Sequence, residues 1–414
     1  MLRALQRSSP TPLHCLLRAV KKGAAACFDP VRTNFYSAQP AGKRHGRVLI
    51  AHLVEGVLLA PDDPLIQTHN HFVEARLMAE VFLELGYAVD FIDYRNGEFV
   101  PRHRYDVFLC PRINFERLAA QMPSGCIKIV HLETAHWLYN NAAALRRLQE
   151  VQSRRGVALT SFTEIKMNRA IEAADYATML GNDYTYEGYA FAGKPVFQLP
   201  NPGNSLHPWR EDKDFNDCRT RFLWLGSRGL VHKGLDVALE AFARMPDLHL
   251  TVCGPIDHDP QFMDAFRKEL YETPNIHTHG WIDTTGPEFA DLVHRTVAHV
   301  YPTCAEGSCG AVINCMHAGL IPVTTRQAGV DIDPLFGVLL PEPSVEAVMD
   351  AAREIAGRPA DELANMARRS HQEAQRVYSA SLYKKAFAAV IARILKGHPR
   401  AAPPSLVRMD EWVS

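Results

Sequence analysis

The stretch YPTCAEGSCGAVINCMHAGLIPV, residues 301–323, places a loop of small residues between a predicted strand and a predicted helix. Residues 297–301 form an apolar run that is typical of a short buried strand. Apolar side chains then recur at helical spacing, at positions 312, 313, 316 and 320, and Gly319 and Pro322 are expected to end the helix. The loop at residues 304–310 therefore joins the carboxyl end of a strand to the amino end of a helix.

Such a loop is a place where ligands bind in open α/β sheets, because the free N–H groups at a helix start attract anions, phosphate above all. Gly307 and Gly310 allow the backbone to approach a ligand closely. Glu306 would repel a phosphate, so we expect it to face sugar hydroxyls. The alternative is that Glu306 only stabilises the start of the helix.

Length and composition predict a globular protein of two domains. The chain has 414 residues, of which 47% are hydrophobic and 22% charged, and this is too long for one ordinary core. The formal net charge is −1, so no global basic field exists to hold a nucleic-acid backbone. Nucleic acid is not an expected partner.

Residues 1–45 form a basic extension with eight Lys or Arg against one acidic residue. Interleaved leucines predict a short amphipathic helix that contacts an anionic membrane surface; a poorly ordered extension is the alternative. No apolar run is long enough for a membrane span or a secretory signal. These features predict a cytoplasmic protein, and the amphipathic-helix interpretation would place it at the inner face of a membrane.

The nine cysteines show no CxxC pair, and several lie inside apolar strand-like runs. They are typical of reduced core residues. Cys304, Cys309, Cys315 and His317 do not have the spacing of a common zinc site, so neither a metal nor a cofactor is expected.

The first half of the chain reads as a Rossmann-like domain over residues 46–203. Buried strands are expected at 47–54, 88–92, 106–110, 127–132, 175–180 and 195–199, with helices at 70–85 and 142–152. This alternation predicts a parallel sheet with right-handed crossovers. The loop after the first strand lacks GxGxxG, which argues against a nicotinamide or flavin cofactor.

The sequence HLETAH follows the strand expected at 127–132 and places His131, Glu133 and His136 at its carboxyl end. That edge of a parallel sheet is the ligand-binding edge, so we expect His131 to be functional, with Glu133 and His136 as weaker candidates. A buried, hydrogen-bonded histidine is the alternative.

The best domain boundary is PNPGN, residues 200–204, because proline and glycine punctuate it. A second Rossmann-like domain is expected over 204–380, with strands at 221–225, 248–253, 276–280, 297–301 and 339–341. Its first loop, GSRGLVHKG, brings Arg228 and Lys233 to the start of a helix at 235–245. Two cations there suit a diphosphate, and two solvated surface charges are the alternative.

This arrangement resembles the retaining nucleotide-sugar glycosyltransferases of family 4, which have two facing Rossmann-like domains, the GT-B architecture. Arg228 and Lys233 match the family loop G-R-L-x-x-x-K-G, which holds the donor diphosphate. Glu306, Gly307 and Gly310 resemble the start of the E-x7-E motif, and Asn314 stands where the family has its second Glu, which binds the donor ribose. His131 resembles a strand-end histidine near the donor sugar. The final helix, 381–396, resembles the one that crosses back to the first domain, with a loose tail at 397–414.

The resemblance implies a retaining, metal-independent transfer of a sugar from a nucleoside diphosphate to a hydroxyl acceptor, such as a glycan, lipid or polysaccharide precursor. The leaving diphosphate would be stabilised by Arg228, Lys233 and the backbone of Gly307, Ser308, Cys309 and Gly310. Glu306 would bind sugar hydroxyls, His131 would orient the sugar or acceptor, and no nucleophile is assigned. The alternatives are an accessory GT-B protein that binds a partner enzyme or a glycan, and an epimerase or phosphorylase of the same fold.

Overall fold

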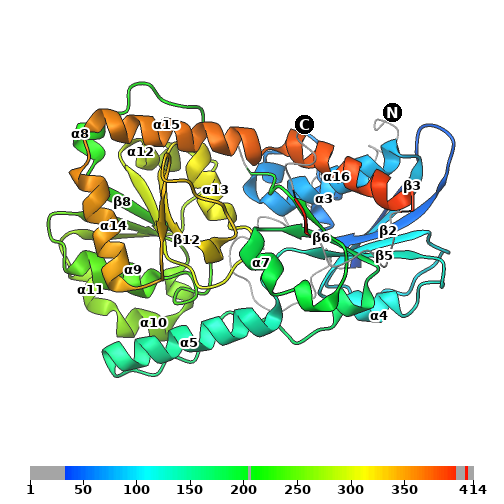
Figure 1. Ribbon diagram of the computed structural model, residues 1–414, viewed down its shortest axis with the longest axis horizontal. Helices are drawn as coiled ribbons and strands as arrows, with labels where there is room; N and C mark the ends of the chain where they lie inside the picture. Colours follow the sequence, from blue (N-terminus) through cyan, green and yellow to red (C-terminus); the bar gives the residue numbers. More distant parts are fainter. Residues whose placement is uncertain (1–32, 204–206, 398–405, 409–414) are drawn as a thin grey trace.

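The computed structural model describes residues 33–203, 207–397 and 406–408, and these form two α/β domains side by side (Figure 1). The first domain has a sheet of order β1-β3-β2-β4-β5-β6-β7-β14. Its central strands are all parallel: β2 (Gly46–His52), β3 (Tyr87–Asp93), β4 (Val107–Pro111), β5 (Ile127–Leu132), β6 (Tyr176–Leu180) and β7 (Val196–Leu199). Near-continuous burial along these strands fits a sheet covered on both faces.

Two edge strands lie in segments that we expected outside the domains. β1 (Phe35–Ala38) pairs antiparallel with β3, and Ser37 Oγ donates to Asp90 Oδ1 at 2.7 Å, so this part of the expected extension belongs to the first sheet. β14 (Leu406–Val407), in the tail expected to be loose, pairs with β7. Residues 1–32, on which the membrane prediction rests, lie outside the described residues.

The second domain has a parallel sheet of order β10-β9-β8-β11-β12-β13. Its strands are β8 (Arg221–Leu225), β9 (His249–Cys253), β10 (Ile276–Gly280), β11 (Ala298–Tyr301), β12 (Ile321–Thr325) and β13 (Val338–Leu340). The sequence reasoning missed β12, because Pro322 read as a helix terminator, whereas it lies inside this buried strand. Among its helices are α9 (Leu235–Ala243), α13 (Gly310–His317), α14 (Val345–Gly357) and α15 (Ala360–Val377).

The chain returns to the first domain through α15 and α16 (Ala380–Leu395), which run along the top of Figure 1. α16 packs on α3 (Asn70–Glu84), with the rings of Phe82 and Phe387 6.0 Å apart in an edge-to-face arrangement. Lys384 Nζ lies 2.7 Å from Glu84 Oε1. The shorter helices are α2 (Glu55–Leu58), α4 (Phe115–Ala119), α6 (Ala170–Ala173), α7 (Asp183–Glu187), α8 (Phe215–Cys218), α10 (Pro260–Ala265), α11 (Arg267–Tyr271) and α12 (Pro287–His294).

Helix α5 (Trp137–Arg155) is longer than the helix expected at 142–152, and it reaches from the first domain along the second (Figure 1). Val151 is fully buried in the core of the second domain. Arg147 Nη2 forms a bidentate contact with Asp236 of α9, at 2.8 and 2.7 Å. The two domains are therefore joined by α5 as well as by α16. No helix among the described residues is long and apolar enough to cross a membrane.

Candidate functional site

Two loops of the second domain meet where β8 and β11 end, because these strands are neighbours in the sheet. Lys233 Nζ, from the loop after β8, lies 2.6 Å from Glu306 Oε1, from the loop after β11. The same carboxylate oxygen accepts from Tyr301 Oη at 3.2 Å and Thr303 Oγ1 at 3.4 Å. The structure thus brings together two of the residues that the sequence assigned to the donor.

Both members of this pair are charged at neutral pH. Burial raises the pKa of Glu306, but the Lys233 ammonium and His232 outweigh it, so the pKa lies below its usual value. Burial lowers the pKa of Lys233, but the nearby Glu306 carboxylate has the larger effect, so the pKa lies above its usual value. Burial also raises the pKa of Tyr301 well above its usual value, so its phenol stays protonated and donates to Glu306.

The residues after Glu306 pack against the first domain. A Cβ at Gly307 would collide with the Glu133 carbonyl group, so the glycine permits a close approach between domains. Thr185 Oγ1 donates to the Gly307 carbonyl at 3.0 Å, and Asn201 Nδ2 donates to the Ser308 carbonyl at 3.1 Å. We expected Gly307 to allow a ligand to approach the backbone closely. In this structure it allows the backbone of the first domain to do so.

We expected the backbone N–H groups at the start of α13 to be free to bind an anion, and the structure differs at Cys309. The Cys309 N–H donates to the Ala328 carbonyl at 2.8 Å, so it is not directed at an anion in this structure. Asn70 of the first domain lies beside Gly310, where an added Cβ would be 3.1 Å from Asn70 Nδ2. Asn314, in the second turn of α13, is partly exposed, and its contact with a ribose stays a prediction.

Arg228 is exposed, in contrast to Lys233. The next residue, Gly229, has φ +86°, and an added Cβ there would collide with Thr163 Oγ1, on the segment that follows α5. The loop is therefore shaped by a contact with the first half of the chain. The assignment of Arg228 to a diphosphate stays a prediction.

His131 is fully buried at the end of β5. Its Nε2 lies 2.9 Å from Glu74 Oε1, and its Nδ1 lies 2.8 Å from Thr178 Oγ1. A direct contact with a sugar would require it to leave these partners. The prediction that it orients a sugar is untested, and this geometry favours an indirect role in which His131 holds Glu74.

The two acceptor-side candidates have separate surroundings. Glu133 Oε1 lies 2.7 Å from Arg112 Nη1; burial raises the pKa of Glu133, but Arg112 and three nearby histidines outweigh it and lower the pKa. His136 caps α5 through Nδ1, and its ring lies 5.3 Å from the rings of both Tyr189 and Phe191. Their roles toward an acceptor stay predictions.

The sequence reasoning missed the residues that support these groups. Tyr301 and Thr303 hold Glu306, and both lie in the stretch of residues 301–323. It also missed a cluster of His52, His71 and Glu74 in the first domain. The polar sequence HNHFVE, at the start of an apolar helix, was the available signal. The described cysteines are all buried and none forms a disulfide.

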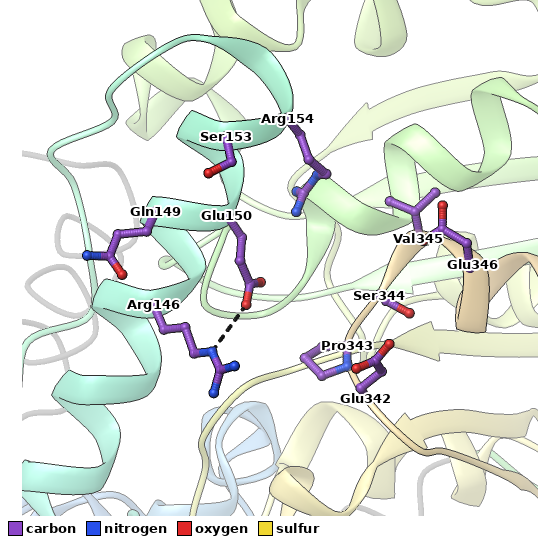
Figure 2. Close-up of a pocket in the computed structure, with 10 residues that line it drawn as sticks. All are labelled: Arg146, Gln149, Glu150, Ser153, Arg154, Glu342, Pro343, Ser344, Val345 and Glu346. Carbon is purple, nitrogen blue, oxygen red and sulfur yellow. Dashed lines mark ion pairs between the residues drawn. The ribbon is translucent and has the colours of Figure 1, made fainter.

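A separate cavity of about 470 Å³ lies between α5 and the loop before α14 (Figure 2). Its lining is mostly charged or polar: Arg146, Gln149, Glu150, Ser153, Arg154, Glu342, Pro343, Ser344, Val345 and Glu346. Figure 2 shows Arg146 turned toward Glu150, with Nε and Oε1 3.5 Å apart. None of the predicted donor residues lines this cavity, which is therefore separate from the loops that carry Lys233 and Glu306.

The two Rossmann-like domains define the GT-B fold, which the solved structures below share. Residues 219–357 match the family model described as glycosyl transferases group 1. This match lies within the second domain and supports the resemblance drawn from the sequence. A search of curated proteins by sequence gives no match.

Solved structures support the fold over most of the chain. Sucrose-phosphate synthase from Thermosynechococcus elongatus is 13% identical, with a TM-score of 0.58 over 87% of this chain and 98% of that chain. HepE from Anabaena, in complex with UDP, is 11% identical, with a TM-score of 0.54 over 85% and 100%. A glycosyltransferase from Rickettsia africae is 13% identical, with a TM-score of 0.52 over 86% and 91%.

The chain spans about half the length, 54%, of the TarM chain from S. aureus, with 11% identity over 70% of this chain. The TM-score of that likeness is 0.49.

Proposed function

We propose that this chain is a retaining glycosyltransferase that moves a sugar from a nucleoside diphosphate to a hydroxyl acceptor. The contact between Lys233 and Glu306 carries the proposal. Lys233 matches the family lysine that binds the diphosphate, and Glu306 matches the family glutamate that binds the sugar. The contact therefore brings the two expected donor-binding residues together. Both residues lie within the segment that matches the group 1 family model.

The leaving diphosphate is the group that this site is suited to stabilise. Cleavage of the donor increases the negative charge on the diphosphate, and a fixed ammonium in a half-buried site stabilises that charge more than water does. Binding of the diphosphate draws Lys233 from Glu306, and the freed carboxylate accepts hydrogen bonds from donor-sugar hydroxyls. Arg228, which is exposed beside the same loop, supplies a second cation. No metal ion is needed at the diphosphate.

We propose UDP as the nucleotide part of the donor. HepE, which shares the fold, has been solved in complex with UDP and glucose. Asn314 takes the position of the family glutamate that binds ribose, and its single carbonyl acceptor makes a weaker contact than a carboxylate does. Nucleotide affinity is therefore expected to be modest.

The acceptor side lies on the first domain, at the carboxyl ends of its strands. Glu133 and His136 follow β5, and Phe191, a residue that is 62% exposed, lies against the His136 ring. We propose that this edge receives the hydroxyl group of a glycan, a lipid or a polysaccharide precursor. Of the basic extension, residues 1–32 would hold the protein at an anionic membrane surface, because β1 already belongs to the first sheet.

Isothermal titration with UDP, GDP, ADP and dTDP tests the function, with magnesium omitted. We expect one nucleotide to bind one site per chain, and we expect Lys233→Ala to weaken that binding. Arg244→Ala removes an exposed cation at the end of α9 and is the matched control. If none of the four nucleotides binds the folded protein, the accessory-protein alternative replaces this proposal.

A further inference from the structure

Three side chains with metal-binding atoms converge inside the first domain. His52 is the last residue of β2, and His71 and Glu74 lie in the first turns of α3. One ligand atom from each lies within 4.8 Å of the other two. His71 Nδ1 is 2.7 Å and His52 Nε2 is 3.6 Å from the same oxygen, Glu74 Oε2. His71 and Glu74 share a helix face because they are three residues apart.

The surroundings of His52 point to a ligand at this place. Its side chain is 2% exposed, and neither ring nitrogen has a hydrogen-bond partner. A buried polar group without a partner is costly and therefore uncommon, whereas a neutral imidazole nitrogen is a common metal ligand. The His71 side chain is 29% exposed, which leaves a path from solvent to the cluster.

A second layer of contacts orients the carboxylate. His131 Nε2 lies 2.9 Å from Glu74 Oε1, the oxygen that does not face His52 and His71. Thr178 Oγ1 in turn lies 2.8 Å from His131 Nδ1. Polar groups behind a ligand commonly fix its orientation in metal sites, and this arrangement leaves Oε2 of Glu74 for an ion.

We propose that His52, His71 and Glu74 bind a zinc ion. Two histidines and one glutamate form a known catalytic-type zinc ligand set, in which water completes the tetrahedron. Zinc bonds of about 2.0–2.2 Å place tetrahedral ligand atoms about 3.3 Å apart. The separations of 2.7 and 3.6 Å bracket that value, so modest side-chain movement accommodates the ion. On binding, the imidazole nitrogen of His71 gives up its contact with Glu74 and coordinates the metal in its neutral form.

The zinc ion would tie the end of β2 to the start of α3, next to the surface that faces the donor loop. Asn70 precedes His71, donates to Asn201 Oδ1 at 2.9 Å, and lies beside Gly310 of the second domain. Asn201 itself donates to the carbonyl of Ser308. The proposed ion therefore stabilises the contact between the first domain and the loop that carries Glu306.

Metal binding by the full chain tests the proposal without reference to activity. The purified protein is stripped with a chelator, titrated with zinc, and analysed for metal content; cobalt(II), whose visible spectrum reports tetrahedral coordination, serves as a second probe. We expect one zinc ion per chain. Mutation of a residue that only hydrogen-bonds to a metal ligand typically weakens metal binding by about 10- to 100-fold. Because His52 and His71 would bind the ion directly, His71→Gln and His52→Gln should each weaken zinc binding by at least about 100-fold.

His277→Gln is the matched control, because His249 and His277 form a surface pair, 3.2 Å apart, that suits adventitious zinc. It should leave the cobalt spectrum and the zinc affinity unchanged. His71 is partly exposed, so His71→Gln decides the result even if His52→Gln fails to fold. Absence of zinc binding at micromolar concentration, or zinc retained in His71→Gln and lost in His277→Gln, overturns the proposal.

Discussion

Lys233 and Glu306 lie at the ends of two neighbouring parallel strands, with Nζ and Oε1 2.6 Å apart. Each is partly buried, with 12% of the lysine side chain and 19% of the glutamate side chain exposed. Under the proposed function, a diphosphate would compete with Glu306 for the ammonium group. The proposal therefore predicts that substrate binding and the stability of the second domain are linked through this pair.

Lys233→Ala is predicted to lower kcat by ten- to a thousandfold, because one charge-stabilising donor contributes about 1.4 to 4 kcal/mol in a transition state. It should also lower the free energy of unfolding by about 1–3 kcal/mol, since Glu306 loses its charged partner in a half-buried site. Steady-state kinetics and urea unfolding measure the two effects, with Lys233→Arg as the charge-conserving control. Full activity with a saturating donor would remove the diphosphate assignment.

Arg228→Ala is predicted to lower kcat over the same range of ten- to a thousandfold without changing the free energy of unfolding. The difference from Lys233 follows from exposure, because the Arg228 side chain lies in solvent. Arg244→Ala, another exposed cation of the second domain, should change neither quantity. A loss of stability in Arg228→Ala would show that this residue supports the loop rather than the substrate.

Asn314→Glu is predicted to tighten UDP binding by about 1 to 2 kcal/mol, roughly five- to thirtyfold, because the carboxylate accepts hydrogen bonds from both ribose hydroxyls. Repulsion from Glu306 and the diphosphate offsets part of this gain. Isothermal titration measures the change, and Asn314→Gln separates the added charge from the added length. If binding weakens more than tenfold in a folded variant, Asn314 does not face a ribose.

Arg147→Met is predicted to lower the free energy of unfolding by about 3 kcal/mol, because it leaves the buried Asp236 short of one cation. The loss is at the lower end of such effects, since Arg154 Nη2 remains 2.6 Å from the same carboxylate. Urea unfolding measures it. The double variant Arg147→Met, Asp236→Leu should recover most of the stability, and a double variant weaker than either single one would contradict this account.

The free energy of unfolding is predicted to fall as the pH drops from 6.5 toward 4. Burial lowers the pKa of His299 and of His317 to about 4, so between these pH values the unfolded chain binds protons that the folded chain does not. The stability is complete above pH 6.5, and each histidine accounts for a loss of up to about 3 kcal/mol.

Urea unfolding at pH 7, 6 and 5 tests this pH dependence. His317→Gln should show a shallower fall than the unmodified protein, whereas His258→Gln, an exposed histidine, should not. Equal slopes in all three proteins would mean that His317 does not titrate differently in the folded and unfolded states.

The sequence by itself determined the parallel strands at the centre of both sheets, with the exception of β12. Buried strands and amphipathic helices have different hydrophobic periods, so their alternation can be read from the sequence. It also placed Arg228, Lys233 and Glu306 in strand-to-helix loops. Neighbouring strands in such a sheet bring those loops to one edge, and the structure places the side chains of Lys233 and Glu306 in contact there.

Only the tertiary structure decided which partners these residues meet. β1 and β14 are short edge strands whose pairing depends on distant residues, so no local pattern predicts them. The reach of α5 across the second domain depends on the buried contact between Arg147 and Asp236, 89 positions apart. Gly307 reads as a ligand-binding glycine in the sequence, but its freedom is used for a contact between domains. His131 likewise lies against Glu74, a buried carboxylate that α3 brings to the end of β5.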